Sequence, residues 1–303
     1  MALQNFCQLV NEIKSLHSLT ISVASAEDES VLSALKDAYK EFGVKAILVG
    51  NQEEIERILK EINYWDFVLD IVSTCDKVQS AKKAVSLVRE GKAHLLMKGL
   101  LQTADFLRAV LDKEEGLRIG RFLSHIFLLY LPSLQRFVGI TDGGLNISPS
   151  LEEKKQIIEN AVSLFYFLGY EKPKVAVLAA LELVNPDMPA TIDAALLSKM
   201  GERRQIKNAI IDGPFALDNA LLLESAFHKK IRSEVAGKAD ILLVPDIEAG
   251  NILAKALIFF GNCEAAGIVW GAKVPLILTS RADSLKTKLL SIALSCFVLQ
   301  RGY

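Results

Sequence analysis

Short apolar runs alternate with amphipathic segments along most of the chain. The amphipathic segments carry apolar residues at helical spacing, and they begin and end with capping residues such as Asn51, with Glu54 three positions on, and Gly43. This alternation predicts βαβ units and a mostly parallel sheet. The first apolar runs are residues 19–25, 44–50, 67–74 and 93–99.

A change in composition predicts a domain boundary near the middle of the chain. Residues 141–150 are rich in Gly, Pro and Ser, and a long helix pattern from Ser150 to Gly169 opens a second series of strands and helices. We therefore predict an α/β protein with two doubly wound α/β/α domains. The last helix is apolar enough to return to the first domain, so the predicted domains are residues 1–141 with 283–303, and residues 142–282.

Composition narrows the classes of protein. With 51% hydrophobic and 23% charged residues, the chain is typical of globular proteins with buried sheets. The 35 Lys and Arg balance 36 Asp and Glu, so we expect neither nucleic acid nor an anionic membrane as a partner. The longest apolar stretch, residues 289–299, is shorter than the about 20 residues that a membrane span needs.

The cysteines indicate a reducing compartment. They lie in or beside apolar sequence without CxxC spacing, so we interpret them as reduced and mostly buried. Because the N-terminal residues also lack the pattern of a secretion signal, we predict a cytoplasmic protein. The cysteines are Cys7, Cys75, Cys263 and Cys296.

Polar side chains gather where a predicted strand ends late in the chain. The apolar run 274–278 is followed by Ser280 and Arg281, and Asp283 opens the next segment. Ligands of open α/β sheets bind beyond the carboxyl ends of the strands, so these groups suggest anion binding. The alternative is that Ser280 or Asp283 only caps the last helix and that Arg281 is a solvated charge.

A second polar cluster follows the predicted strand 239–245. Asp246 comes first, and the pair Gly250-Asn251 opens a helix whose backbone N–H groups would hold an anion. The alternative is a capped helix with a solvated aspartate.

Other candidates have equally plain structural alternatives. Lys98 ends a strand, either as a ligand or as a surface lysine, and Asp142 follows a strand or makes a turn. Ser124 and His125 lie inside an apolar strand, where a histidine is more often a core residue than a catalyst. Signatures of other classes, such as GxxxxGK[ST], GxGxxG, HExxH and GxSxG, are absent from the sequence.

The chain resembles the phosphate acetyltransferase and phosphate butyryltransferase family over nearly its full length, and the butyryl branch more closely. Two long strings, PDIEAGN and LTSRADS, carry most of this specificity. The matching segments are LMKG (96–99), TADFLRA (103–109), LSH (123–125), VNPDMPATIDAA (184–195), DGPFALDNA (212–220), VAGKADILLVPDIEAGNILAKAL (235–257) and AGIVWGAKVPLILTSRADS (266–284).

The resemblance implies transfer of an acyl group between coenzyme A and inorganic phosphate, with butanoyl-CoA and phosphate giving butanoyl phosphate and CoA. It also implies a fold like that of isocitrate and isopropylmalate dehydrogenases, a site in a cleft between the domains, no metal and no permanently bound cofactor. We further expect a homo-oligomer, either a dimer or a multiple of dimers.

The family's catalytic Ser-Arg pair matches Ser280 and Arg281, but its aspartate seven positions after the serine is Thr287 here. The base therefore stays open between Asp283 and Asp246. The substrate-binding residues that we expect are Lys98, Thr103, Ser124, His125, Asp142, Asp246, Gly250 and Asn251.

Three other functions remain to be weighed. A phosphate acetyltransferase, or an enzyme for other short or branched acyl chains, would differ only in the room for the acyl tail, worth about 1–3 kcal/mol per methylene. A metal-dependent decarboxylating dehydrogenase would need paired aspartates and a nucleotide loop, which we do not find. A non-catalytic acyl-CoA-binding protein would not need the Ser280-Arg281 pair.

Overall fold

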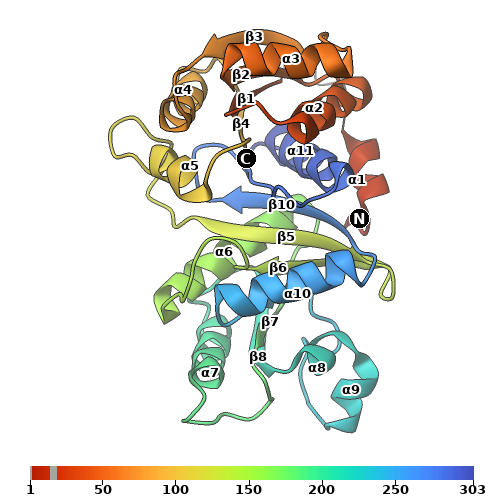
Figure 1. Cartoon of the computed structure of the whole chain (residues 1–303). Coiled ribbons are helices and arrows are strands. Elements are labelled where there is room, and N and C mark those ends of the chain that lie inside the picture. The colour runs from red at the N-terminus through yellow and green to blue at the C-terminus, as the bar shows by residue number, and fades with distance from the viewer. Residues whose placement is uncertain (1, 14–18) are drawn as a thin grey trace. The chain divides into compact units, whose positions relative to one another are not determined.

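The computed structural model of the chain describes residues 2–13 and 19–303 (Figure 1). Contacts divide the chain into two compact units. The first unit comprises Phe6–Arg121 and Ala266–Tyr303, and the second comprises Phe122–Ala265 with the described residues up to Asn5. The sequence placed the boundaries after residues 141 and 282. The difference arises because the strand just before residue 142 pairs with a strand of the second unit, near residue 241.

The strands of the first unit stand in the order β3-β2-β1-β4-β11-β10. The neighbours from β3 to β11 are parallel, and β11 is antiparallel to β10. The chain order reverses at β1, which has β2 on one side and β4 on the other, and such switch points are where doubly wound sheets bind ligands. The bounds are β1 Thr20–Ala24, β2 Lys45–Gly50, β3 Val68–Ser73, β4 Leu95–Lys98, β10 Glu264–Trp270 and β11 Leu276–Ile277.

Helices of the first unit begin where capping residues occur in the sequence. Asp28 accepts hydrogen bonds from the N–H groups of Ser30 and Val31, and Gly43 ends the same helix with a φ of 77°. The predicted caps Asn51 and Gly43 are thus confirmed. The helices are α1 Phe6–Glu12, α2 Glu29–Phe42, α3 Gln52–Ile62, α4 Lys77–Arg89, α5 Thr103–Val110 and α11 Leu285–Gln300.

Helix α11 is the most buried helix of the first unit and packs against α1 and α2. Its middle is apolar on every side, as expected of a core helix. Helix α1 was not predicted, because its seven residues are too short to show a helical period.

The second unit has the strand order β5-β6-β9-β7-β8. Strands β5 and β6 form an antiparallel hairpin, and β6, β9, β7 and β8 run parallel. The strands are β5 Ser124–Leu131, β6 Arg136–Thr141, β7 Lys174–Leu178, β8 Ile210–Phe215 and β9 Ile241–Leu243. The helices are α6 Leu151–Phe167, α7 Pro189–Glu202, α8 Leu217–Leu221, α9 Leu223–His228 and α10 Ile247–Phe259.

Two helix predictions in the second unit were wrong in detail. A single helix was predicted from residue 220 to 230, but Leu222 is extended and separates α8 from α9. Consecutive leucines hide such a break, because their spacing does not define one apolar face. Helix α10 begins at Ile247, three positions before Gly250, because Asp246 caps it.

The predicted α/β class is confirmed by this mixture of parallel strands and covering helices. Within the described part of the chain, no helix is long and apolar enough to cross a membrane. All four cysteines are free, but Cys7 and Cys75 are exposed, so the prediction of mostly buried cysteines holds only for Cys263 and Cys296.

Candidate active site

In the first unit, the carboxyl ends of three neighbouring parallel strands carry the predicted catalytic residues. Lys98 is the last residue of β4 and pairs with Ala24 at the end of β1, while β11 runs beside β4 and continues into the turn 279–283. Strands that are parallel and in register end at the same edge of a sheet. The ammonium of Lys98 and the Ser280-Arg281 pair therefore lie at one edge, next to the sheet's switch point.

The turn that carries Ser280 and Arg281 is folded by its own side chains. The Oδ2 of Asp283 accepts a hydrogen bond of 2.7 Å from the backbone N–H of Ser280, and the Oγ of Ser280 accepts from the N–H of Ala282 at 3.4 Å. Asp283 is thus placed to fix the turn, with Ser280 and Arg281 exposed on it.

Sequence reasoning missed the residue that anchors this turn. Lys288 in α11 is 1% exposed, and its Nζ donates to the carbonyl oxygens of Ser280 at 3.2 Å and Asp283 at 2.7 Å. A buried ammonium that bonds two carbonyls of one turn holds its backbone in place. The signal in the sequence was a lysine inside the most apolar helix of the chain.

Helix α11 does not begin at Asp283 or at Ser280. Its N-cap is Ser284, whose Oγ accepts from the N–H of Thr287 at 3.1 Å. The capping alternative for Ser280 and Asp283 is therefore wrong. Thr287, which replaces the family's aspartate, is 8% exposed, and its hydroxyl lies 3.0 Å from that of Ser284.

Lys98 is a buried cation rather than the surface lysine of the alternative interpretation. It is 6% exposed, and its Nζ donates to the carbonyl oxygens of Gly99 at 3.1 Å and Leu101 at 3.2 Å. Burial is the main cause that lowers the pKa of Lys98, and the positive charge of Arg281 is the next. Mutual repulsion of two cations at a strand end is relieved by a bound anion.

Arg281 has its guanidinium available. It is exposed, and it makes no ion pair or hydrogen bond with the part of the chain that the structure describes. The charge that lowers the pKa of Lys98 is therefore not neutralised by a close partner of its own. Thr103, also predicted to bind substrate, begins α5 a few residues after Lys98 and is partly buried.

In the second unit, Asp142 is committed to structure. It is 2% exposed; its Oδ1 accepts from the N–H groups of Gly144 and Leu145 at 2.8 Å, and its Oδ2 accepts from the N–H of His125 at 2.9 Å and from Asn146 at 2.7 Å. These four bonds occupy both oxygens of the carboxylate. They hold the loop after β6 in place.

Gly250 and Asn251 join the same loop to α10. A Cβ on Gly250 would lie 2.7 Å from the Cα of Gly143, and Asn251 donates to the carbonyl of Gly143 at 3.0 Å. Asp246 caps α10 by accepting from the N–H of Ala249 at 2.8 Å. The N–H of Gly250 bonds to the carbonyl of Asp246, so it is not one of the unpaired N–H groups expected at a helix start.

Ser124 and His125 are core residues of β5. Ser124 is fully buried and accepts from the side chain of Asn160 at 2.9 Å. His125 is 2% exposed, and its ring packs edge-on against Phe127 with 4.3 Å between centroids. Its ring also lies against Gly144, where a Cβ would come within 2.8 Å of it. The structure thus brings the predicted residues of this unit together, but mostly as partners of one another.

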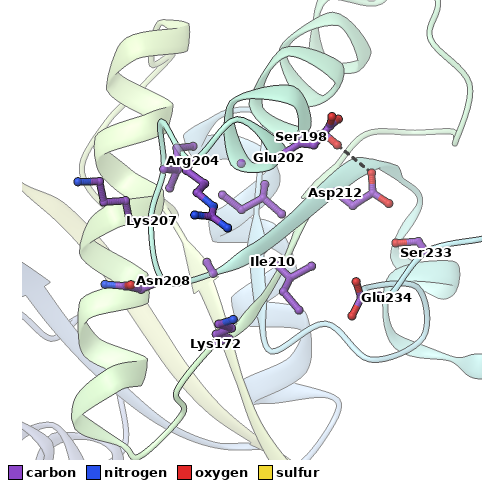
Figure 2. A pocket seen from close by; sticks show the side chains of 14 residues that line it. Lys172, Ser198, Glu202, Arg204, Lys207, Asn208, Ile210, Asp212, Ser233 and Glu234 are labelled. Atoms are coloured by element: carbon purple, nitrogen blue, oxygen red, sulfur yellow. Dashed lines mark hydrogen bonds between the residues drawn. The ribbon is translucent and has the colours of Figure 1, made fainter.

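The largest cavity described, about 1050 Å³, lies elsewhere in the second unit (Figure 2). It opens where β7 and β8 begin, at the end of the strands opposite to the candidate residues. Both charge signs line it, and Asp212 accepts from Ser198 at 3.0 Å (Figure 2). None of the predicted site residues lines this cavity.

A smaller hollow of about 580 Å³ lies at the carboxyl ends of β2 and β3 in the first unit. Asn51, Thr74 and Cys75 are among its lining residues, and the Oγ1 of Thr74 is buried without a partner in the described structure. These parallel strands end at the edge that also carries Lys98. The sequence gave no sign of this hollow.

Comparison with protein families finds one match that covers most of the chain. Residues 69–296 match the model described as "Phosphate acetyl/butaryl transferase". The chain is 45% identical to a phosphate butyryltransferase of Clostridium acetobutylicum over 98% of both chains. It is also 46% identical to a phosphate acetyltransferase of Thermotoga maritima, over 91% of this chain and 93% of that one.

Solved structures give the same picture. The crystal structure of a branched-chain phosphotransacylase from Enterococcus faecalis V583 superposes with a TM-score of 0.82 at 34% identity, covering 92% of this chain and 98% of the other. The two sets of relatives differ in the acyl group that their names give, and identity to this chain does not separate them.

Proposed function

The chain belongs to the phosphate acetyl/butyryl transferase family, and from this premise we propose that it transfers an acyl group reversibly between butanoyl-CoA and inorganic phosphate. The products in one direction are butanoyl phosphate and CoA. The name of the Clostridium acetobutylicum relative supports the choice of butanoyl, as do the motifs of the butyryl branch. No metal and no permanently bound cofactor takes part in the proposed reaction.

The observation that carries the proposal is the pairing of a buried cation with an available one at a strand end. Lys98 points its charge into the edge where Arg281 stands exposed, and their repulsion helps to lower the pKa of Lys98. A phosphate dianion between them would offset both charges. Arg281 would donate two parallel N–H bonds to phosphate oxygens, and Lys98 would add a point charge.

The bond changes then follow from simple chemistry. A phosphate oxygen attacks the thioester carbonyl carbon, the C–S bond breaks, and the sulfur leaves as thiolate, which takes a proton. Ser280 is placed on the same turn as Arg281, where its hydroxyl would donate to the sulfur or to the developing oxyanion. One such preorganised donor contributes about 3–4 kcal/mol of transition-state stabilisation.

In the reverse direction the CoA thiol must lose its proton, because a free thiol with a pKa near about 8.5 is only a few per cent ionised at neutral pH. Asp283 is our candidate base, because it lies beside Ser280 and uses one oxygen to hold the Ser280 N–H. Asp246 is the weaker candidate, since its carboxylate caps α10. A positioned base adds about 10²–10⁴ in rate.

The remaining predicted residues are proposed to shape the site. Thr103, at the start of α5, is proposed to bind substrate together with Lys98. In the second unit we propose that the loop held by Asp142 contacts substrate through its backbone, while Ser124, His125, Gly250 and Asn251 fix that loop. We also propose that the protein is a cytoplasmic homo-oligomer that binds neither nucleic acid nor membrane.

A thiol-release assay tests the function. Purified protein is given acetyl-, butanoyl- and isobutanoyl-CoA, each with and without phosphate, and free CoA is followed with a thiol reagent. We expect release that depends on phosphate and the highest kcat/KM with butanoyl-CoA. No release from any of the three esters would refute acyl transfer and favour a protein that only binds acyl-CoA.

The second candidate is an acetyl- or branched-chain phosphate acyltransferase. It is favoured by the 46% identity to the Thermotoga maritima acetyltransferase and by the branched-chain structure from Enterococcus faecalis. The same panel decides between them, because the best turnover with acetyl-CoA or isobutanoyl-CoA would replace butanoyl while leaving the reaction type unchanged.

A further inference from the structure

Helix α10 of the second unit is apolar on two faces. Its inner face packs against the core of the unit, through residues such as Ala254, Leu253 and Leu257. Its outer face carries Ile252, which is 69% exposed, and Phe259, which is 50% exposed. A helix that is apolar on both faces is normally buried on both, so the outer face calls for a cover.

The exposed residues of that face form a narrow stripe. Glu248, Ile252, Lys255 and Phe259 follow one another at intervals of four, three and four residues, and all four are exposed. At about 100° per residue, these positions lie within about 60° around the helix axis. We call them the α10 stripe. It has an acid at one end, an aromatic ring at the other, and Ile252 and Lys255 between them.

This order is complementary to itself when reversed. If two copies of α10 lie antiparallel with a two-fold axis at Ile252, the residues opposite each other have numbers that add to 504. Glu248 then lies within about one residue, or about 1.5 Å along the axis, of Lys255 in the other copy. The two symmetric Glu248–Lys255 contacts flank an Ile252–Ile252 contact.

The ends of the stripe also find partners. Phe259 lies about 10 Å beyond Ile252 along the helix, and Ile247 about 8 Å before it. The N–H of Ile247 bonds to the carbonyl of Ile147, which is 71% exposed. Phe259 of one copy would therefore come beside Ile147 of the other, covering two exposed apolar side chains at each end.

From this complementarity of charge and shape we propose that a second copy of this chain covers the α10 stripe, as a two-fold antiparallel pair of α10 helices. The contact is isologous, because every residue of the stripe meets a stripe residue or Ile147 of the other copy. Helices packed in this way lie about 8–10 Å apart. The pairing does not depend on which acyl group the enzyme uses.

The first test replaces the residue at the axis. Ile252→Glu would set two carboxylates against each other, and its exposure means that the fold should tolerate the change. Sedimentation equilibrium of the full-length protein should show the wild type associated and Ile252→Glu with half the mass. Leu69→Glu, at an isolated exposed position of β3 in the first unit, is the matched control and should keep the wild-type mass.

The second test exchanges the charges. Glu248→Lys and Lys255→Glu alone should each raise the dissociation constant about tenfold, because two attractive contacts become repulsive. The double variant should return it to within about threefold of the wild type. A monomeric wild type, an Ile252→Glu variant of unchanged mass, or a double variant no tighter than the singles would overturn the proposal.

Discussion

Replacing Arg281 by alanine isolates the step on which the proposed reaction depends. Two charge-assisted hydrogen bonds to phosphate contribute about 1.5–3 kcal/mol each, so their loss costs about 3–6 kcal/mol. Since each 1.4 kcal/mol is a factor of ten, kcat/KM for phosphate should fall by about 10²–10⁴. The butanoyl-CoA KM should change much less, because the guanidinium is assigned to phosphate.

The same variant should leave the fold intact. Arg281 is exposed and has no ion pair within the described chain, so the free energy of unfolding should change by no more than about 0.5 kcal/mol. Thermal melts check this, and initial rates over a phosphate series give kcat and KM separately. Arg57→Ala, an exposed arginine of α3 paired with Glu54 and Glu61, is the control.

Arg281→Lys separates charge from geometry. A lysine keeps the positive charge but cannot donate the planar pair of bonds, so it should recover only part of the lost kcat/KM. If Arg281→Ala has phosphate kinetics within about twofold of the wild type and of Arg57→Ala, the guanidinium does not bind phosphate and the assignment of the site is wrong.

Three further predictions follow from the same edge of the sheet. Asp283→Asn should lower kcat by about 10²-fold and remove the acidic limb of the pH–rate profile for acyl-CoA synthesis, and an unchanged profile would place the base elsewhere. Lys288→Met should raise the phosphate KM about tenfold with little change in acyl-CoA KM, because the carbonyls of Ser280 and Asp283 lose their donor; an unaltered phosphate KM would show that the turn holds without it. Because the pKa of Lys98 is lowered from 10.5, phosphate binding should weaken with rising pH below 10.5, and Lys98→Arg should remove this dependence. The unfolded chain binds that proton more tightly, so Lys98 should also make the free energy of unfolding rise with pH between its lowered pKa and 10.5, as urea titrations at several pH values would show.

Local signals in the sequence predicted the elements that depend on local chemistry. Ser150 and Glu153 form the capping box that starts α6, and Gly169 follows its end with a φ of 93°. Each of these features involves residues within one turn of helix. The alternation of strands and helices, which sets the α/β class, is local in the same sense.

Features that depend on contacts between distant segments could not be read in this way. Lys288 looked like an anomaly in an apolar helix, because its partners at Ser280 and Asp283 are recognisable only once the turn is folded. Asp142 looked like a ligand, because the four N–H donors that occupy it come from several segments of the folded loop and strand. A sequence shows which residues carry charge but not which charges are already paired.

Pairing also divides the work between the predicted residues. Carboxylates 142 and 246 are satisfied by backbone N–H groups, so they have little capacity left for a ligand and would repel an anion if they had any. The cations behave in the opposite way, since Arg281 has no close partner in the described structure and Lys98 is buried beside its charge. Free positive charge that repels itself is stabilised by an incoming anion, whereas a fully bonded carboxylate is not changed by one. The charge of phosphate is therefore expected to be balanced by residues of the first unit, which makes Arg281 and Lys98 the positions where substitution should affect phosphate most strongly.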